Sequence, residues 1–168
     1  MEARPIIKPT VTSSDNIVEW ICGLVLFLMW ILTIYVFIIS PDIIPIHFNG
    51  SGKVDNYGSK IFIFLLPSIA TGIYFSLTAL SKYPHIFNYL SKITFDNALQ
   101  QYTNATRMLR YLKLVILIIF TTIIFVTYLN IIAVKDGLGN WFLPLIIILL
   151  LIPTIIFLAQ TVKKKNIQ

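Results

Sequence analysis

The residues whose types could support chemistry are concentrated in one polar stretch, Pro41–Lys60, of an otherwise apolar chain. The stretch holds His47, Asn49, Asp55 and Lys60. An imidazole and a carboxylate that meet can orient a proton donor, act as a general base or help to hold a metal ion. We therefore predict that His47 and Asp55 face each other. All four side chains are candidates for binding a ligand or for shaping the loop.

A metal centre or a catalytic centre has weak support in this stretch. Structural zinc sites need four nitrogen or sulfur ligands, and catalytic sites need three together with a water. Apart from His47, the stretch offers Asp42 and Asp55, and the single cysteine, Cys22, lies inside an apolar run. These groups are too few for a nucleophile, a base and an oxyanion site. We expect no cofactor and no enzyme, and we leave a metal at His47 open. The alternative role of the polar side chains is to hydrogen-bond the loop's own backbone.

The stretch is expected to form a short hairpin. Ile44, Ile46 and Phe48 alternate with proline or polar residues, which is typical of an extended segment with one apolar side. The sequence Asn-Gly-Ser-Gly at 49–52 is a strong turn signal, because Asn and Gly adopt a positive φ at low cost. A second strand should follow over 53–57. The three apolar residues should then pack on the rest of the protein.

The elements that position this loop are apolar runs long enough to cross a membrane. The chain has 168 residues, of which 57% are hydrophobic and 12% are charged, whereas about a quarter of residues are charged in soluble domains. At about 1.5 Å per residue, a helix of about 20 residues crosses the hydrocarbon core. We predict an all-α integral membrane protein with a single domain, residues 1–168. Its four transmembrane helices are expected at about 17–39, 61–80, 112–134 and 141–162.

Lysine and arginine are distributed unevenly between the two ends of these predicted helices. Ten lie on the side of the termini and three on the side of the polar stretch. The ten are Arg4, Lys8, Lys82, Lys92, Arg107, Arg110, Lys113, Lys163, Lys164 and Lys165, and the three are Lys53, Lys60 and Lys135. Positive residues favour the cytoplasmic side. We therefore predict cytoplasmic N and C termini and an outward-facing polar stretch.

A second patterned stretch lies before the third predicted span. Apolar residues recur there at spacings of four and three, and amide and basic side chains lie between them: Ala98, Tyr102, Ala105, Leu109 and Leu112. The pattern predicts an amphipathic helix over 94–112, at the cytoplasmic interface, before the chain turns into the third span. Such a helix could attach to lipid headgroups or could dock a cytoplasmic protein partner. The polar segment 1–16 is expected to be extended or frayed.

The polar stretch resembles the signature of the family called domain of unknown function 1648 (DUF1648). The signature residues present here are Pro41, Ile44, Pro45, His47, Phe48, Asn49, Gly52, Asp55, Ser59 and Lys60. Residues 83–113 and 141–144 also resemble members of this family. The resemblance implies a small multi-pass protein of the bacterial cytoplasmic (inner) membrane. The same domain forms the amino-terminal part of larger proteins similar to the SdpI immunity protein, and we expect this chain to hold one such domain without the further spans of that type.

Two classes of function fit these features. The first is a binding, sensing or immunity-type module, in which the outer loop 41–60 recognises a peptide or protein and the bilayer surrounds the helices. The alternative is an accessory or transport subunit of a membrane complex. The predicted spans contain almost no ionisable residue beyond Glu19 and Lys113 at their edges, whereas ion pathways usually place charge at membrane depth. We expect the first function, and we expect no nucleic-acid partner.

Overall fold

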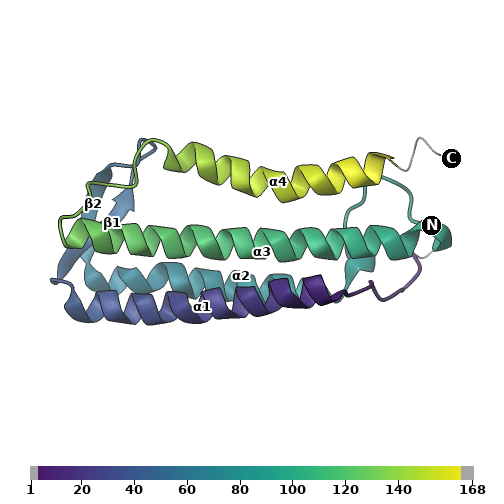
Figure 1. The fold of residues 1–168 in the computed structure, drawn as a ribbon, viewed down its shortest axis with the longest axis horizontal. Helices are drawn as coiled ribbons and strands as arrows, with labels where there is room; N and C mark the ends of the chain where they lie inside the picture. Colours follow the sequence, from purple (N-terminus) through teal and green to yellow (C-terminus); the bar gives the residue numbers. More distant parts are fainter. Residues whose placement is uncertain (1–3, 164–168) are drawn as a thin grey trace.

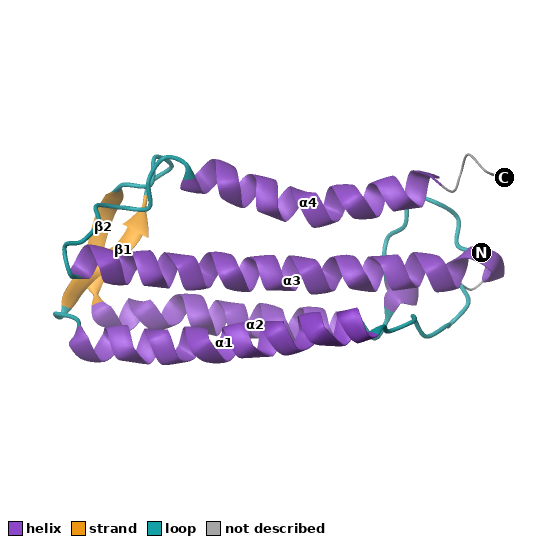
Figure 2. Cartoon of the chain, viewed as in Figure 1, coloured by secondary structure: helices purple, strands orange, loops and turns teal. Residues whose placement is uncertain are grey.

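The computed structural model describes residues 4–163, with side chains up to residue 160, and shows a bundle of four long helices (Figures 1 and 2). The chain is mostly helical, as predicted, and four helices are long and apolar enough to cross a membrane. The elements in order are α1 (Ser13–Ile39), β1 (Ile43–Phe48), β2 (Val54–Ser59), η1 (Lys60–Phe64), α2 (Leu65–Leu80), η2 (Pro84–Ile86), α3 (Phe95–Ile131) and α4 (Phe142–Lys163). These helices are compatible with a multi-pass membrane protein.

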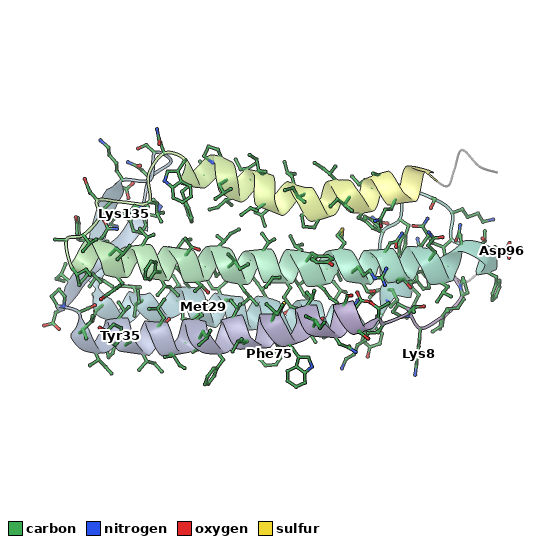
Figure 3. All side chains as sticks on the ribbon, in the orientation of Figure 1. Lys8, Met29, Tyr35, Phe75, Asp96 and Lys135 are labelled. Atoms are coloured by element: carbon green, nitrogen blue, oxygen red, sulfur yellow. The ribbon has the colours of Figure 1, made fainter. Side chains whose placement is uncertain are left out.

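The two ends of the bundle differ, and we name them for use below. The hairpin end carries β1, β2 and the loop between α3 and α4, whereas α1 begins and α4 ends at the opposite end (Figure 1). Apolar side chains cover the helices along their length, and the labelled Lys135 and Lys8 lie at opposite ends (Figure 3). We call the end where α1 begins the ionic end, for the charged side chains described below. Lys164 and Lys165, which entered the topology prediction, lie outside the described residues.

The core of the bundle lies between α1, α2 and α3. Its buried side chains are apolar or small and come from all three helices and from the two short segments beside them: Cys22, Met29, Val36, Ile44, Ile63, Ala70, Leu117 and Ile124. Helix α4 packs mainly on α3, through a second cluster that includes Ile119, Val126 and Phe142. Among the described residues α4 has its main contacts with α3, and much of its surface is open: Ile147, Ile148 and Leu151 are about half exposed.

The second span begins with a tighter helical turn. Residues Lys60–Phe64 form the 3-10 helix η1, and the α-helical part starts at Leu65. Pro67 explains the change, because proline has no N–H to donate and its ring clashes with the carbonyl four residues earlier. A 3-10 turn before the proline avoids that clash. The predicted span at about 61–80 therefore corresponds to η1 and α2 together, Lys60–Leu80.

Helix α3 differs from the two-part arrangement that we expected. It runs from Phe95 to Ile131 in 37 residues without a break, so 94–112 is not a separate helix that turns into the third span. The capping box at Thr94 and Asn97 starts it, and no Gly or Pro follows that could end it within the span. It ends before the expected residue 134, and Ala133 then has a positive φ of 57°.

The apolar stripe at the start of α3 is covered by other segments of the same chain. Ala98 and Tyr102 are fully buried and form a cluster with Ile93, against which Ile7 and Tyr89 pack. The Tyr102 hydroxyl donates to the Pro5 carbonyl at 2.9 Å. Gln101 and Arg110, which the pattern placed on the polar side, are also buried. The N-terminal segment therefore covers part of the helix surface that we had assigned to lipid headgroups or a partner, and the amphipathic pattern stays a prediction.

Residues 4–12 are consequently an ordered strap across the ionic end. The Thr10 amide donates to the Thr103 hydroxyl at 3.0 Å, and the Arg4 guanidinium donates to the Phe87 carbonyl at 2.6 Å. Arg4 also lies over the Tyr89 ring, at 5.8 Å from its centroid. Burial raises the pKa of the Tyr89 phenol, and the hydroxyl donates to the Pro84 carbonyl. These contacts fix the strap before the chain enters α1.

Candidate functional site

The two side chains that were predicted to meet, His47 and Asp55, are in contact at the hairpin end. Strands β1 and β2 pair antiparallel, and their register shifts on either side of His47. His47 pairs with Asn56 and Phe48 pairs with Val54, so Asp55 is an extra residue on β2. A bulge of this kind re-aims a side chain. His47 Nδ1 lies 2.5 Å from Asp55 Oδ1.

This pair is exposed to solvent and has few neighbouring side chains that could bind a metal ion. The side chains of His47 and Asp55 are 65% and 40% exposed. Within residues 4–163, no group of three or more His, Cys, Asp or Glu residues could hold a metal ion. An exposed ion pair contributes little to stability, about 0–1 kcal/mol. The pair is therefore available for contact with another molecule but is not arranged as a metal centre.

Asn49 shapes the turn. Its Oδ1 accepts hydrogen bonds from the Ser51 amide at 3.0 Å, from the Ser51 hydroxyl at 2.7 Å and from the Lys53 amide at 3.0 Å. The backbone amide of Asn49 donates to the Lys53 carbonyl. A short amide side chain that caps its own turn is a structural arrangement. Asn49 is thus engaged with the loop's own backbone, which is the alternative role that the sequence left open.

Lys60 joins the end of β2 to the end of α1. Its Nζ lies 3.2 Å from Asp42 Oδ1 and donates to the Ser40 carbonyl at 3.3 Å. It also lies over the Phe37 ring at 5.4 Å from the centroid. These contacts hold the base of the hairpin against α1. Lys60 is distant in sequence from the turn and is placed with Asp42 rather than with Asp55.

The apolar side of the hairpin deviates from strict alternation. Ile44 is buried and Phe48 packs on the cluster with Leu138 and Phe142, but Ile46 is 36% exposed. The register shift between Pro45 and His47 makes Ile46 an extra residue on β1. The expectation that Ile44, Ile46 and Phe48 all pack on the bundle therefore fails at Ile46, because a period of two does not continue through a bulge.

The hairpin turn is attached to the loop between α3 and α4 by a close glycine contact that sequence reasoning missed. The Leu138 amide donates to the Gly52 carbonyl at 2.6 Å. A Cβ on Gly52 would lie 2.4 Å from the Gly139 oxygen, and one on Gly137 would lie 2.2 Å from the Gly52 oxygen. All three glycines have φ between 75° and 86°. The two glycines at 137 and 139 were a signal for such a backbone contact.

Together, β1, β2 and residues 132–141 form a cap on the helices, which we call the hairpin cap. Beneath it lies a cavity of about 550 Å3, the hairpin cavity. Apolar side chains from β1, η1, α2, α3 and α4 line most of it, including Phe62, Ile123 and Leu143, and His47, Asn49 and Asn56 contribute polar groups. The volume is within the range of about 300–1,000 Å3 that is typical of small-ligand sites.

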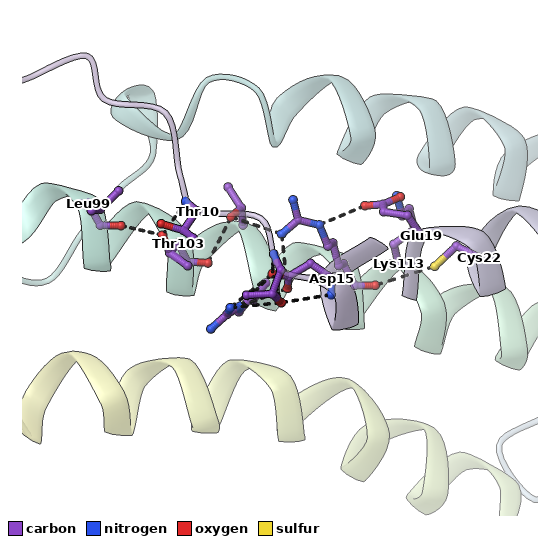
Figure 4. A network of polar contacts seen from close by, with 11 residues as sticks. Thr10, Asp15, Glu19, Cys22, Leu99, Thr103 and Lys113 are labelled. Atoms are coloured by element: carbon purple, nitrogen blue, oxygen red, sulfur yellow. Dashed lines mark hydrogen bonds and ion pairs between the residues drawn. The ribbon is translucent and has the colours of Figure 1, made fainter. Parts of the chain in front are cut away.

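A cluster of ion pairs at the ionic end was also missed (Figure 4). Asp15 on α1 is buried, and its carboxylate accepts from Arg107 Nε at 3.0 Å and from Arg107 Nη2 at 3.2 Å. Arg110 Nη1 lies 3.8 Å from the same carboxylate. Asp15 also completes the capping box with Thr12 that starts α1. One carboxylate therefore both caps a helix and binds two guanidinium groups of α3.

The next helical turn adds a second carboxylate and a third cation. Lys113 Nζ lies 2.5 Å from Glu19 Oε2, and Arg110 Nε lies 3.2 Å from Glu19 Oε1. Lys113 is 1% exposed and also donates to the Thr78 hydroxyl on α2 at 2.9 Å. It lies over the Tyr74 ring at 4.7 Å from the centroid. We call Asp15, Glu19, Arg107, Arg110 and Lys113 the ionic cluster.

The sequence contained a signal for this ionic cluster. Asp15 and Glu19 are four residues apart, and Arg107, Arg110 and Lys113 are three apart, so each set lies on one face of its helix. Opposite charges on facing stripes favour pairing of α1 with α3. Three of the ten basic residues that predict the topology are paired inside the bundle, so the distribution of positive charge alone does not reveal the ionic cluster.

The comparisons with known proteins find one match. The profile of the family described as "Domain of unknown function (DUF1648)" matches residues 24–71, which are most of α1, the hairpin, η1 and the start of α2. No significant match was found among curated proteins or among solved structures. The matched segment contains His47, Asn49, Asp55 and Lys60. The likeness to the DUF1648 family is therefore shown for residues 24–71, which hold the hairpin, and not for the rest of the chain.

Proposed function

We propose that this chain is a bacterial inner-membrane binding module that takes an apolar segment of a peptide at the hairpin cap. The hairpin cavity is the observation that carries the proposal. It combines apolar walls from both the cap and the helices with polar groups of His47, Asn49 and Asn56. An apolar side chain of a peptide would enter the cavity, while the exposed His47–Asp55 pair would contact its polar backbone.

The strands of the cap support a peptide rather than a rigid small molecule. The sheet has two strands, so each strand is paired along one edge and has a second edge without a partner strand. Such an unpaired edge offers N–H and C=O groups to an extended peptide. The contacts of Gly52 with Gly137 and Gly139 hold the cap in place. A preformed site loses less entropy on binding than one that must be assembled.

The distribution of charge supports a position of the cap outside the cell. Positive residues are concentrated at the ionic end, and the positive-inside tendency would place that end in the cytoplasm and the cap outside. A peptide that arrives from outside would then meet the cap first. Sensing of such a peptide, or immunity against it as the resemblance to SdpI-type proteins suggests, is a use of this binding and rests on fold-level analogy.

Matched tryptophan variants test the site. Leu143 lines the hairpin cavity and is 46% exposed, whereas Leu145 does not line it and is 38% exposed. The protein is embedded in lipid nanodiscs, and apolar peptides are selected from a displayed random library. We expect Leu143→Trp to weaken binding of the selected peptides by about tenfold or more, because it fills the cavity. Leu145→Trp should leave binding unchanged.

The polar part of the site is tested with the same peptides. His47→Ala and Asp55→Ala should both weaken binding while leaving the amount of protein in the membrane unchanged. If the two variants do not accumulate, the pair is structural. If Leu143→Trp and Leu145→Trp bind the peptides equally, or if no apolar peptide is selected, the hairpin cavity is not the binding site.

An accessory or transport subunit is the second candidate, and the exposure of α4 favours it. Helix α4 packs mainly on α3, and its Ile148 and Ile155 are more than half exposed. Such a face could pack on another membrane protein instead of lipid. Crosslinking in the native membrane tests this candidate: a specific adduct through α4 supports it, and a chain that crosslinks to nothing contradicts it.

A further inference from the structure

A second cavity, separate from the hairpin cavity, lies at the ionic end between α3 and α4. It has a volume of about 750 Å3, and its lining comes from α3, from α4 and from the start of α1. In Figure 4, α4 lies apart from the ion pairs that join α1 to α3. Pro153 lies inside α4 and lines this cavity. We call it the α3–α4 cleft.

The walls of the α3–α4 cleft change from polar to apolar with depth. Near the ends of the helices they contain Asn104, Arg107 and Gln160, and towards the middle of the bundle they contain Val115 and Leu149. At about 1.5 Å per residue, the distance from Arg107 to Val115 along α3 is about 12 Å, and from Gln160 to Leu149 along α4 about 16 Å. One leaflet of the hydrocarbon core is about 15 Å, half of about 30 Å. The cleft therefore has the polarity profile and length of one leaflet.

The charge next to the cleft is positive. Three cations of the ionic cluster face two carboxylates, since Asp15 pairs with both arginines and Glu19 pairs with Arg110 and Lys113. The Arg110 and Lys113 side chains are 9% and 2% exposed, but that of Arg107 is 37% exposed. Arg107 also lines the cleft, whereas Arg110 and Lys113 do not. Asp15 lines the cleft as well, but its side chain is 6% exposed, so the charge that a ligand in the cleft can reach is that of the Arg107 guanidinium.

We propose that the α3–α4 cleft binds an anionic phospholipid of the surrounding bilayer. Its phosphate lies at Arg107, within reach of the Asn104 and Gln160 amides, and one acyl chain lies along Ile152 and Ile156. Basic pockets between transmembrane helices bind such headgroups, and a guanidinium suits a phosphate. A free phosphate would leave the apolar part of the cleft unfilled, and a zwitterionic lipid would not balance the excess charge.

Photolabelling of the full chain tests this site. The protein is placed in phosphatidylcholine nanodiscs that contain a trace of phosphatidylglycerol with a diazirine in its acyl chain. After illumination, labelled residues are located by mass spectrometry. We expect labelling of α3 around Met108–Val115 and of α4 around Leu149–Phe157. Unlabelled phosphatidylglycerol should compete, whereas phosphatidylcholine and glycerol phosphate should not.

Two pairs of matched variants separate the acyl and headgroup contacts without changing the ionic cluster. Ile152 lines the cleft and Ile155 does not, and both are about half exposed. Ile152→Trp should abolish the labelling, and Ile155→Trp should not change it. Asn104→Asp places a negative charge beside Arg107 and should weaken phosphatidylglycerol binding by about fivefold. Asn88→Asp makes the same charge change on an exposed residue outside the cleft and should have little effect.

Three outcomes would overturn the proposal. Equal competition by phosphatidylcholine would show that the cleft does not select an anionic headgroup. Equal labelling of the Ile152→Trp and Ile155→Trp variants would place the lipid elsewhere. Protection of the cleft by a second copy of the chain, seen as a crosslinked dimer with no lipid label, would show a protein interface instead. None of these results depends on the peptide site at the hairpin cap.

Discussion

The hairpin end and the ionic end both contain paired charges, but the pairs differ in burial and in the elements they join. His47 and Asp55 lie on adjacent strands eight residues apart and are largely exposed. Asp15 and Arg107 are 92 residues apart, and Asp15 is buried. The first pair connects parts of one loop, whereas the second connects two helices. The most concentrated polar stretch in the sequence is therefore the less important one for the fold.

The difference in burial determines what the loss of one charged partner costs at each end. At the hairpin end, water can replace a lost partner, so the pair is free to contact a ligand. At the ionic end, removal of one partner leaves a charge where water has little access, which is costly. The proposed binding at the cap and the stability that the ionic end provides should therefore respond to different substitutions.

Removal of a buried carboxylate should give the largest effect. Asp15→Ala deletes the partner of Arg107 and Arg110 and also the capping box, so we expect a loss of about 3–5 kcal/mol in the free energy of unfolding. Asp42→Ala removes a carboxylate whose side chain is 92% exposed, and should cost about 0–1 kcal/mol. Denaturant unfolding in a mild detergent measures both. Equal losses would remove the distinction between the two ends.

Substitution in the glycine contact should have the next largest effect. Gly137→Ala introduces a Cβ into contact with the Gly52 carbonyl at a positive φ of 76°. The positive φ alone costs about 1–3 kcal/mol. Gly72→Ala is the control, since nothing lies within 4 Å of its Cβ, and in a helix it should stabilise by about 0.5–1 kcal/mol. Unfolding and limited proteolysis at residues 132–141 give the readout. An undisturbed cap in Gly137→Ala would show that the glycine contact is dispensable.

Loss of one buried hydroxyl at the strap should have a smaller effect. Tyr102→Phe removes the bond to the Pro5 carbonyl, at a cost of about 1 kcal/mol. Hydrogen exchange of the amides of residues 6–8 and 10–12 should increase, while that of the hairpin cap should not. Tyr57→Phe is the control, because Tyr57 is 61% exposed. A strap that exchanges at the same rate in both variants would mean that other contacts hold it.

The smallest effect is expected at the exposed pair. Asp55→Asn keeps the shape of the side chain and removes its charge, and should change the free energy of unfolding by about 0–1 kcal/mol. The measurement is the same denaturant unfolding as for Asp15→Ala. A loss as large as that of Asp15→Ala would mean that the His47–Asp55 pair is structural, and would remove it from the proposed binding site.

Much of the helical framework could be predicted because its causes are local in sequence. Run length and hydropathy indicate α1, α2, the second part of α3 and α4, and the Asn-Gly-Ser-Gly signal indicates the turn at 49–52. The start of α3 was harder, because its apolar stripe fits a membrane surface and the strap equally well. Contacts between segments distant in sequence, such as that between Tyr102 and Pro5, 97 residues apart, decide between them.

The candidate sites were predictable to different extents for the same reason. His47 and Asp55 are close in sequence, so a turn between them sufficed to predict their contact. The ionic cluster and the glycine contact join distant segments, and spacing within one segment shows only which face a residue occupies. The orientation of the termini and the single-domain boundary at 1–168 stay predictions.

The long separation of Asp15 from its partners has a consequence for how the protein is made. A ribosome that adds about 5–20 residues per second needs several seconds to reach Arg107 after Asp15, given their separation of 92 residues. During that interval α1 has its two carboxylates without their counter-charges, so its first turns are expected to stay hydrated at the membrane surface. When α3 has been made, its cations can pair with the two carboxylates of α1. The strap can form its contacts with Thr103 and Tyr102 only after that. Newly made chains should therefore be most vulnerable to degradation before α3 has emerged.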